Sequence, residues 1–211
     1  MAIIELAYPK LKTEPEIIKK AEQEAIPVAI NAFKEVGVLN GLSGLIETQD
    51  GRDVSSDVRL MLVLEWPSRS VFDAFVESAA YKNFRGLLQP LSQGPPELKL
   101  YEASDASKFF SSDSVLEVLE IRPKPAVAQG DAVENTLKAI HAAVEKSIDP
   151  KAVYGTTLNL DQKEVVVTRL FATQSELATE AAGASRRELL ANIGDLAEVT
   201  RLVAKVDRIP F

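Results

Sequence analysis

One stretch of the sequence, residues 65–84, constrains the fold more than any other. An apolar strand ends at Trp66, the chain turns at Pro67, and an amphipathic helix follows. A weaker copy of this strand–turn–helix pattern returns in the second half of the chain, at residues 170–177. The sequence therefore predicts one small α+β unit that is present twice.

Hydrophobic periodicity predicts the element order β-α-β-β-α-β in each half. In the first half the expected strands are residues 3–8, 42–48, 58–66 and 97–101, with helices within 13–36 and 70–90. In the second half they are residues 115–121, 154–160, 164–171 and 199–206, with helices within 131–148 and 173–193. Pro27 should divide the first helix, Ser68 or Ser70 should cap the second, and Thr173 with Glu176 forms a capping box.

A polar segment, residues 104–113, separates the two halves. We expect a first repeat at residues 1–103, a linker at 104–113 and a second repeat at 114–211. Phe109 and Phe110 are too apolar for a free tether, so we expect them to hold the linker against the protein surface.

Each unit should form an antiparallel sheet with helices on one face, and the bare face of that sheet must be covered. The simplest cover is the other repeat. The predicted fold class is therefore α+β, with two ferredoxin-like β-α-β-β-α-β repeats packed sheet to sheet as an intrachain α+β barrel. A chain of 211 residues is long enough to bury such a core.

Composition excludes several function classes. A formal net charge of −7 without a basic stripe argues against nucleic acid as a partner. No apolar stretch approaches the ~20 residues of a membrane span, so we expect no membrane association. The absence of cysteine fits a reducing compartment, and we expect a cytoplasmic protein. His141 is the sole histidine and has no acidic partner at ligand spacing, so no metal site is predicted.

These patterns resemble the dimeric α+β barrel superfamily, which includes antibiotic-biosynthesis-monooxygenase-type domains, stress-responsive A/B-barrel proteins and olivetolic-acid-cyclase-like enzymes. The strand that ends in Trp66, the helix with Phe72, Phe75 and Tyr81, and the strand order carry the resemblance, which covers nearly the whole chain as two fused copies. It implies a ligand site between the helices and the sheet of one repeat. It also implies that one fused chain is a monomer (a pseudo-dimer), with a homodimer as the alternative.

The catalytic residues of these families are mostly replaced in this sequence. Cyclase-like members carry histidines where Glu5 and Leu60 stand, and a tyrosine and a histidine where Phe75 and Tyr81 align. Haem-degrading relatives use an asparagine, a tryptophan and a histidine, of which only Trp66 is kept. The resemblance therefore argues against haem degradation and against a histidine-based cyclisation.

Strand alternation predicts an apolar pocket in the first repeat. Its expected wall is Phe33, Leu60, Leu62, Leu64, Trp66 and Phe75, with Tyr81 beside it. Glu5 would be the one charge that enters it, and lost hydration should raise its pKa, which suits a general acid or base. Tyr81 could donate a hydrogen bond to a developing enolate or phenolate. The alternative is that the aromatic residues are core and Glu5 faces solvent or pairs with a lysine.

In the second repeat the corresponding positions include Glu117, Arg169 and Glu180. They could form a buried salt-bridge cluster that fills a degenerate site. Alternatively, Arg169 could bind the anionic group of a ligand, because its planar guanidinium matches a carboxylate.

The sequence thus favours a cofactor-free enzyme that acts on a small, apolar, enolisable or phenolic metabolite in the first repeat. Cyclisation, isomerisation, dehydration and oxygenation all fit the predicted pocket. The alternative is a non-catalytic α+β barrel protein that binds a metabolite or serves in stress response, because the familiar catalytic histidines are missing.

Overall fold

A computed structural model describes residues 2–103, 109–110, 114–127, 130, 132–147 and 152–211. The first half contains β1 (Ala2–Tyr8), α1 (Pro15–Lys20), α2 (Ile26–Val36), β2 (Asn40–Gln49), β3 (Arg52–Asp53), β4 (Leu60–Trp66), α3 (Arg69–Glu77), α4 (Ala79–Leu88) and β5 (Glu97–Ala103). The second half contains β6 (Ser114–Pro123), α5 (Ala132–Ser147), β7 (Val153–Thr156), β8 (Val165–Phe171), α6 (Gln174–Ala181), α7 (Ala184–Ile193) and β9 (Ala197–Arg208). The predicted order β-α-β-β-α-β occurs in both.

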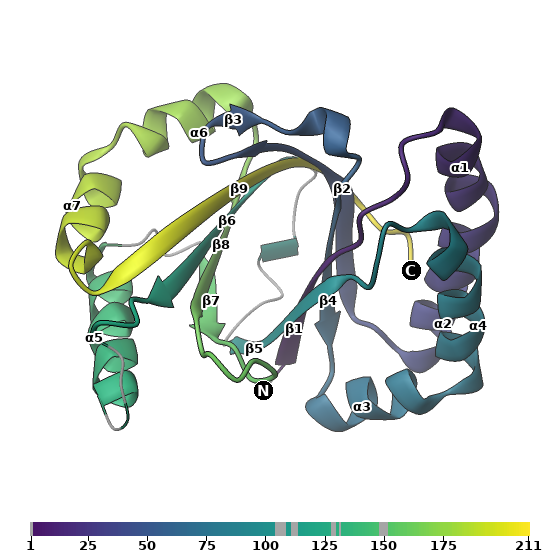
Figure 1. The fold of residues 1–211 in the computed structure, drawn as a ribbon, viewed down its shortest axis with the longest axis horizontal. Coiled ribbons are helices and arrows are strands. Elements are labelled where there is room, and N and C mark those ends of the chain that lie inside the picture. Colours follow the sequence, from purple (N-terminus) through teal and green to yellow (C-terminus); the bar gives the residue numbers. More distant parts are fainter. Residues whose placement is uncertain (1, 104–108, 111–113, 128–129, 131, 148–151) are drawn as a thin grey trace.

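The strands form one antiparallel sheet in the order β5-β1-β4-β2-β9-β6-β8-β7, and the short β3 pairs with β2. Pairing of β2 with β9 joins the two halves. At the other seam Tyr101 bridges Thr157, and the Leu158 N–H donates to the Leu100 carbonyl at 2.7 Å. The sheet is therefore a nearly closed barrel, with α1, α2 and α4 outside one half and α5 and α7 outside the other (Figure 1). This confirms the predicted fold class.

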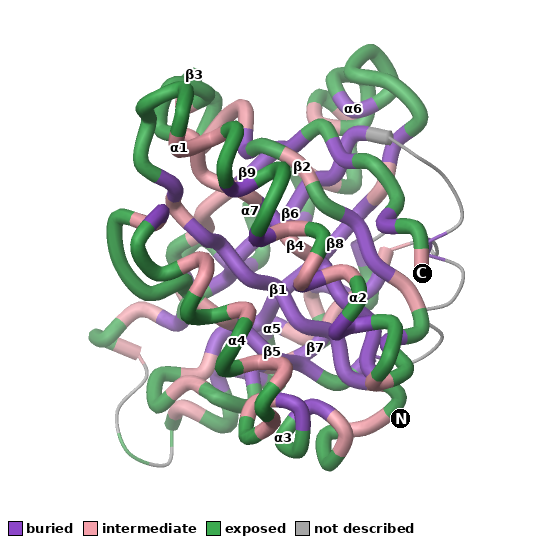
Figure 2. The backbone as a smooth tube through the Cα atoms, turned by 90° about the vertical axis from the view of Figure 1, so that its right-hand side faces the viewer, coloured by how far each residue is buried: buried purple, intermediate pink, exposed green. Residues whose placement is uncertain are grey.

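Alternating residues of each strand face the barrel interior and the helices. On β1, Ile4 and Leu6 lie in the interior core, whereas Ile3 packs on the helix side. On β4, Met61 and Val63 likewise face inward. Figure 2 shows buried residues concentrated along the strands and exposed ones along helices and turns. A site between the sheet and the helices would therefore be lined by the strand residues that face the helices.

Helix ends follow the sequence signals closely. Pro27 lies in the first turn of α2, after a π-helical turn at Ala21–Ala25 that separates α2 from α1. The Ser68 hydroxyl caps α3, and Thr173 caps α6 by accepting from the Glu176 N–H at 3.1 Å. Each predicted second helix is split into two, because the chain becomes extended at Ser78 and at Gly183.

Phe109 and Phe110 correct one expectation. They are only 4% and 1% exposed and belong to the core inside the barrel, so the prediction that they lie against the surface was wrong. An apolar barrel interior removes both rings from water more completely than a surface groove would. The neighbouring linker positions, and Asp131 at the start of the α5 region, lie outside the described residues. The domain boundaries stay a prediction.

A buried ion-pair cluster lies where the barrel closes. Lys99 of β5 is fully buried, and its Nζ atom lies 2.8 Å from Glu120 Oε1 and 3.0 Å from Glu164 Oε2. Arg122 reaches the other oxygen of Glu164 at 2.9 Å. These contacts link β5 of the first half to the second half across the seam.

Candidate functional site

The aromatic residues predicted for the first half form one packed cluster on the helix side of the sheet. Trp66 is fully buried, and its ring centroid lies 5.4 Å from that of Phe72 and 5.2 Å from that of Phe75. Phe33 meets Trp66 edge to face at 6.2 Å. Tyr81 contacts Phe75 at 5.4 Å, at the border of the cluster. Leu64 is buried among these rings, so side chains fill this part of the space between helices and sheet.

Glu5 lies beneath this cluster and is 7% exposed. The Trp66 indole Nε1 donates a hydrogen bond to Glu5 Oε2 at 2.7 Å. Burial raises the pKa of Glu5 from 4.5 to about 7, although the hydrogen bond from Trp66 acts in the opposite direction. The raised pKa expected from the sequence is confirmed, and the alternative of a solvent-facing Glu5 is excluded. Near neutral pH this carboxyl group can both give and accept a proton.

A cavity of about 470 Å³ lies beside the cluster, between α2, α4 and the outer face of β2, β4 and β9. Apolar side chains form most of its wall: Ile26, Ala29, Ile30, Phe33, Leu45, Leu60, Leu62, Phe84, Leu88 and Ile209. The polar lining residues are Ser43, Glu47, Lys205 and Asp207. A volume of this size suits a small organic molecule.

Three predicted wall residues, Phe33, Leu60 and Leu62, line this cavity. The others, Leu64, Trp66, Phe75 and Tyr81 together with Glu5, belong to the adjacent packed cluster and its border. Glu5 pairs with Leu64 across β1 and β4, which makes Leu62 its diagonal neighbour on the same face. Diagonal neighbours in antiparallel sheets are about 7–8 Å apart, and their β-carbons are somewhat closer. The carboxyl group therefore lies one side chain beyond the cavity wall.

Several lining residues were not anticipated from the sequence. Phe84 and Leu88 are spaced as one face of a helix, and this spacing could have indicated them. Lys205 and Asp207 come from β9, a strand of the second half that pairs with β2. No local pattern reveals that pairing.

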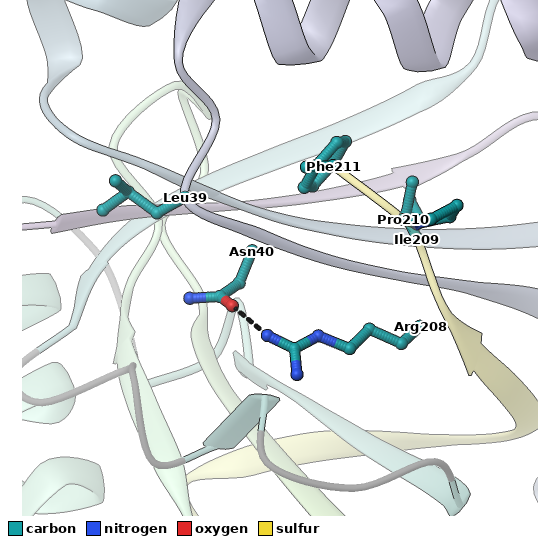
Figure 3. Close-up of a pocket in the computed structure, with 6 residues that line it drawn as sticks. All are labelled: Leu39, Asn40, Arg208, Ile209, Pro210 and Phe211. Carbon is teal, nitrogen blue, oxygen red and sulfur yellow. Dashed lines mark hydrogen bonds between the residues drawn. The ribbon is translucent and has the colours of Figure 1, made fainter.

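A second cavity, of about 270 Å³, lies where β9 ends against the start of β2. Figure 3 shows its lining residues, Leu39, Asn40, Arg208, Ile209, Pro210 and Phe211. Arg208 Nη2 donates to Asn40 Oδ1 at 2.9 Å, and Asn40 Nδ2 donates to Glu65 Oε2 at 2.7 Å. Its polar groups are thus engaged with one another, which makes it a weaker site for an organic ligand than the larger cavity.

In the second half, Glu117 is fully buried beneath three arginines. Arg169 donates through Nε at 2.9 Å and also through Nη2, while Arg186 Nη1 and Arg201 Nε each lie 2.6 Å from Glu117 Oε1. Burial by itself would raise the pKa of Glu117, but the charges of Arg169 and Arg186 and the hydrogen bonds hold it below its ordinary value. The expected ion cluster exists, although Glu180 was the wrong partner because it is exposed on α6.

His141 is half-buried on α5, where its Nε2 atom lies 2.6 Å from Thr156 Oγ1. Burial lowers the pKa of this histidine. Among the described residues, no group of three histidine, cysteine or acidic side chains is arranged to hold a metal ion.

Comparison with solved structures identifies the architecture. The chain is similar to a candidate monooxygenase from Fusobacterium nucleatum, with a TM-score of 0.61 and 15% identity over 98% of this chain and 93% of that one. It is also similar to a candidate chlorite dismutase, with a TM-score of 0.62 and 8% identity over 99% and 96% of the two chains. An anthrone oxidase-like protein matches with a TM-score of 0.59 and 11% identity over 98% and 91%.

The chain shares the α+β barrel fold of these solved structures. At identities this low, the likeness establishes the fold and leaves the reaction open. No protein-family model and no curated protein matches the sequence. No described helix is long and apolar enough to cross a membrane.

Proposed function

We propose that this protein is a cofactor-free oxygenase that acts on a small, apolar, enolisable or phenolic molecule bound in the 470 Å³ cavity of the first half. The observation that carries the proposal is the pairing of an apolar cavity with Glu5, a carboxyl group whose pKa is raised to about 7. Oxygenation is favoured over cyclisation, isomerisation and dehydration because two of the similar structures are named as a candidate monooxygenase and an anthrone oxidase-like protein.

In the proposed reaction the Glu5 carboxylate removes a proton from an activated carbon of the substrate. The carbanion or phenolate that forms then reduces molecular oxygen directly. For anthrone the balance is one anthrone plus one O₂ to one anthraquinone plus one water, so no external reductant is required. Trp66 holds the carboxylate in place through its indole hydrogen bond, and Tyr81 is the proposed donor to the substrate oxygen.

For Glu5 to act as the base, the substrate must lie in a particular position in the cavity. Phe33, Leu60 and Leu62 provide the apolar wall, and the reacting carbon must lie at the Leu62 end of the cavity. We propose that a change of rotamer at Leu62 or Phe33 lets the substrate reach Glu5 from there. The same movement would bring the ligand against Leu64, Trp66 and Phe75, which belong to the packed cluster next to Glu5.

Anthrone is the probe that tests the reaction. Oxygen consumption and the absorbance of the quinone report turnover by the purified protein above the rate without protein. Glu5→Gln removes the proton acceptor but keeps an amide for Trp66, so we expect kcat to fall by about 10²–10⁴-fold. Glu22→Gln, an exposed change of the same type on the α1–α2 segment, is the matched control. Equal turnover by the Glu5 and Glu22 variants would remove Glu5 from the mechanism.

A second candidate function is non-catalytic binding of an apolar metabolite in the same cavity. It is favoured by the separation of Glu5 from the cavity wall and by its hydrogen bond to Trp66, which suits a structural role. Leu62→Trp, which fills the cavity, should abolish binding of 1-naphthol under both functions. Oxidation of anthrone by the wild-type chain distinguishes the two.

A further inference from the structure

The arginines around Glu117 carry more positive charge than their described partners neutralise. Arg169 projects from β8, Arg186 from α7 and Arg201 from β9, and all three converge on one carboxylate. Among the described residues, the other carboxylate that hydrogen-bonds any of them is Asp50, which accepts from the backbone N–H of Arg201 at 2.8 Å. Even with Asp50 included, the cluster keeps a net positive charge.

The hydrogen-bond capacity of the cluster is also largely unused. Each guanidinium has five N–H donors, so the three offer about fifteen. Four hydrogen bonds reach Glu117, and they occupy the acceptor capacity of its two oxygens. The remaining donors need water or another acceptor, because an unpaired polar group is costly when it is partly buried.

The three arginine side chains differ in how far they are exposed to solvent. The side chain of Arg169 is 9% exposed, that of Arg186 is 11% exposed and that of Arg201 is 22% exposed. A small anion can therefore approach from the side of Arg186 and Arg201 without displacing Glu117. Arg169 also stacks on Phe171, with 5.4 Å between its Cζ atom and the ring centroid, which fixes the guanidinium plane.

The first turn of α7 adds to the positive potential. Arg186 is the third residue of this helix, and the N-cap residue, Gly183, has no side chain to accept from the free backbone N–H groups. Such an uncapped helix start carries partial positive charge and favours negative groups nearby.

We propose that Arg169, Arg186 and Arg201 form a binding site for a small oxyanion, a phosphate or carboxylate group, on the helix side of the second half. Glu117 orients the three guanidinium groups, and their outward N–H donors bind the anion. This site is separate from the cavity of the first half and does not depend on the proposed oxygenase activity.

Inorganic phosphate is the first probe, measured by thermal unfolding of the full chain at pH 7. Phosphate should raise Tm progressively with its concentration relative to sodium chloride of equal ionic strength, because a ligand of the folded state stabilises it. The chloride series accounts for simple screening of arginine repulsion. Isothermal titration calorimetry gives the dissociation constant directly.

Arg186→Gln should weaken phosphate binding at least about tenfold, because it removes a charged donor but leaves Glu117 paired with two arginines. Arg187→Gln is the matched control, since this exposed neighbour donates to the Ala182 carbonyl and not to Glu117. Should Arg186→Gln fail to fold, Arg201→Gln removes the most exposed member and should weaken binding in the same way.

Phenyl phosphate distinguishes a free anion from the anionic group of an organic ligand. Binding as tight as that of inorganic phosphate indicates a free anion, tighter binding indicates an organic ligand, and either supports the site. No stabilisation by phosphate beyond matched chloride, or equal binding by the Arg186 and Arg187 variants, overturns it.

Discussion

The two halves of the barrel bury a glutamate at the same position and treat it in opposite ways. Glu5 and Glu117 each lie on the first strand of their half and face the helices. Glu5 pairs across the sheet with Leu64, whereas Glu117 pairs with Arg169. One carboxyl group has a neutral indole donor and its pKa rises to about 7, while the other has three arginines and its pKa falls.

Burial alone therefore does not determine the charge of a carboxyl group. Desolvation is the largest influence at both sites and raises the pKa in each. Opposite charges reverse the result only in the second half. The same scaffold position therefore holds a carboxyl group with a pKa of about 7 in one half and an ionised anchor for arginines in the other.

The largest expected effect is on stability when the anchor is removed. Glu117→Gln leaves three guanidinium groups close together without a counter-charge, and we expect the free energy of unfolding to fall by about 3–5 kcal/mol. Urea denaturation at pH 7 measures it, with the exposed Glu198→Gln on β9 as the control. A loss below about 1 kcal/mol would show that the arginines do not depend on Glu117.

Glu5→Gln should instead change how stability depends on pH. The folded state keeps the Glu5 proton up to about pH 7, whereas the unfolded state releases it near 4.5, so this group makes stability fall as pH rises through that window. The fall amounts to about 3 kcal/mol and is absent in the variant. Measured from pH 4.5 to pH 8, the stability of the variant relative to wild type should therefore rise by that amount. A constant difference across this range would contradict the raised pKa.

Trp66→Phe removes the one hydrogen bond described for the Glu5 side chain and should cost about 1–3 kcal/mol. It should also raise the pKa of Glu5 further, because that hydrogen bond favours the charged form. Phe75→Leu is the control, since Phe75 touches the indole but makes no bond to the carboxyl group. The two variants should separate in a pH titration, and identical titrations would assign the effect of Trp66 to packing.

The smallest predicted effect is the loss of a helix cap, a feature that the two halves share. Ser68 and Thr173 cap the helices that follow β4 and β8. Ser68→Ala and Thr173→Ala should each cost about 1 kcal/mol. Chemical denaturation of both variants gives the comparison, and a cost confined to one of them would show that the two helix starts are not equivalent.

Much of the fold could be predicted from the sequence because its signals are local. Alternation on β4 placed Leu60, Leu62, Leu64 and Trp66 on the helix side, and capping residues marked where α3 and α6 begin. The individual contacts that close the barrel could not be predicted from such local signals. The burial of Lys99 depends on Glu120 and Glu164 from the other half, and no pattern near Lys99 in the sequence predicts these partners.

The candidate site was predicted in part for the same reason. The raised pKa of Glu5 followed from its apolar neighbours, and Phe33, Leu60 and Leu62 do line a cavity. Arg186 and Arg201 were missed as partners of Glu117, because they converge on it from α7 and β9 only after folding. The catalytic role of Glu5 and Tyr81, and the part of Arg169 in binding a ligand, stay predictions.

The most direct test of the contrast between the halves is a carbon-13 NMR titration of the two glutamate side chains in the wild-type protein. The carboxyl signal of Glu5 should titrate with a pKa of about 7, and that of Glu117 should titrate below its ordinary value of 4.5. Single Glu→Gln variants assign the two signals. Titration of both groups near 4.5, or the reverse order, would contradict the account.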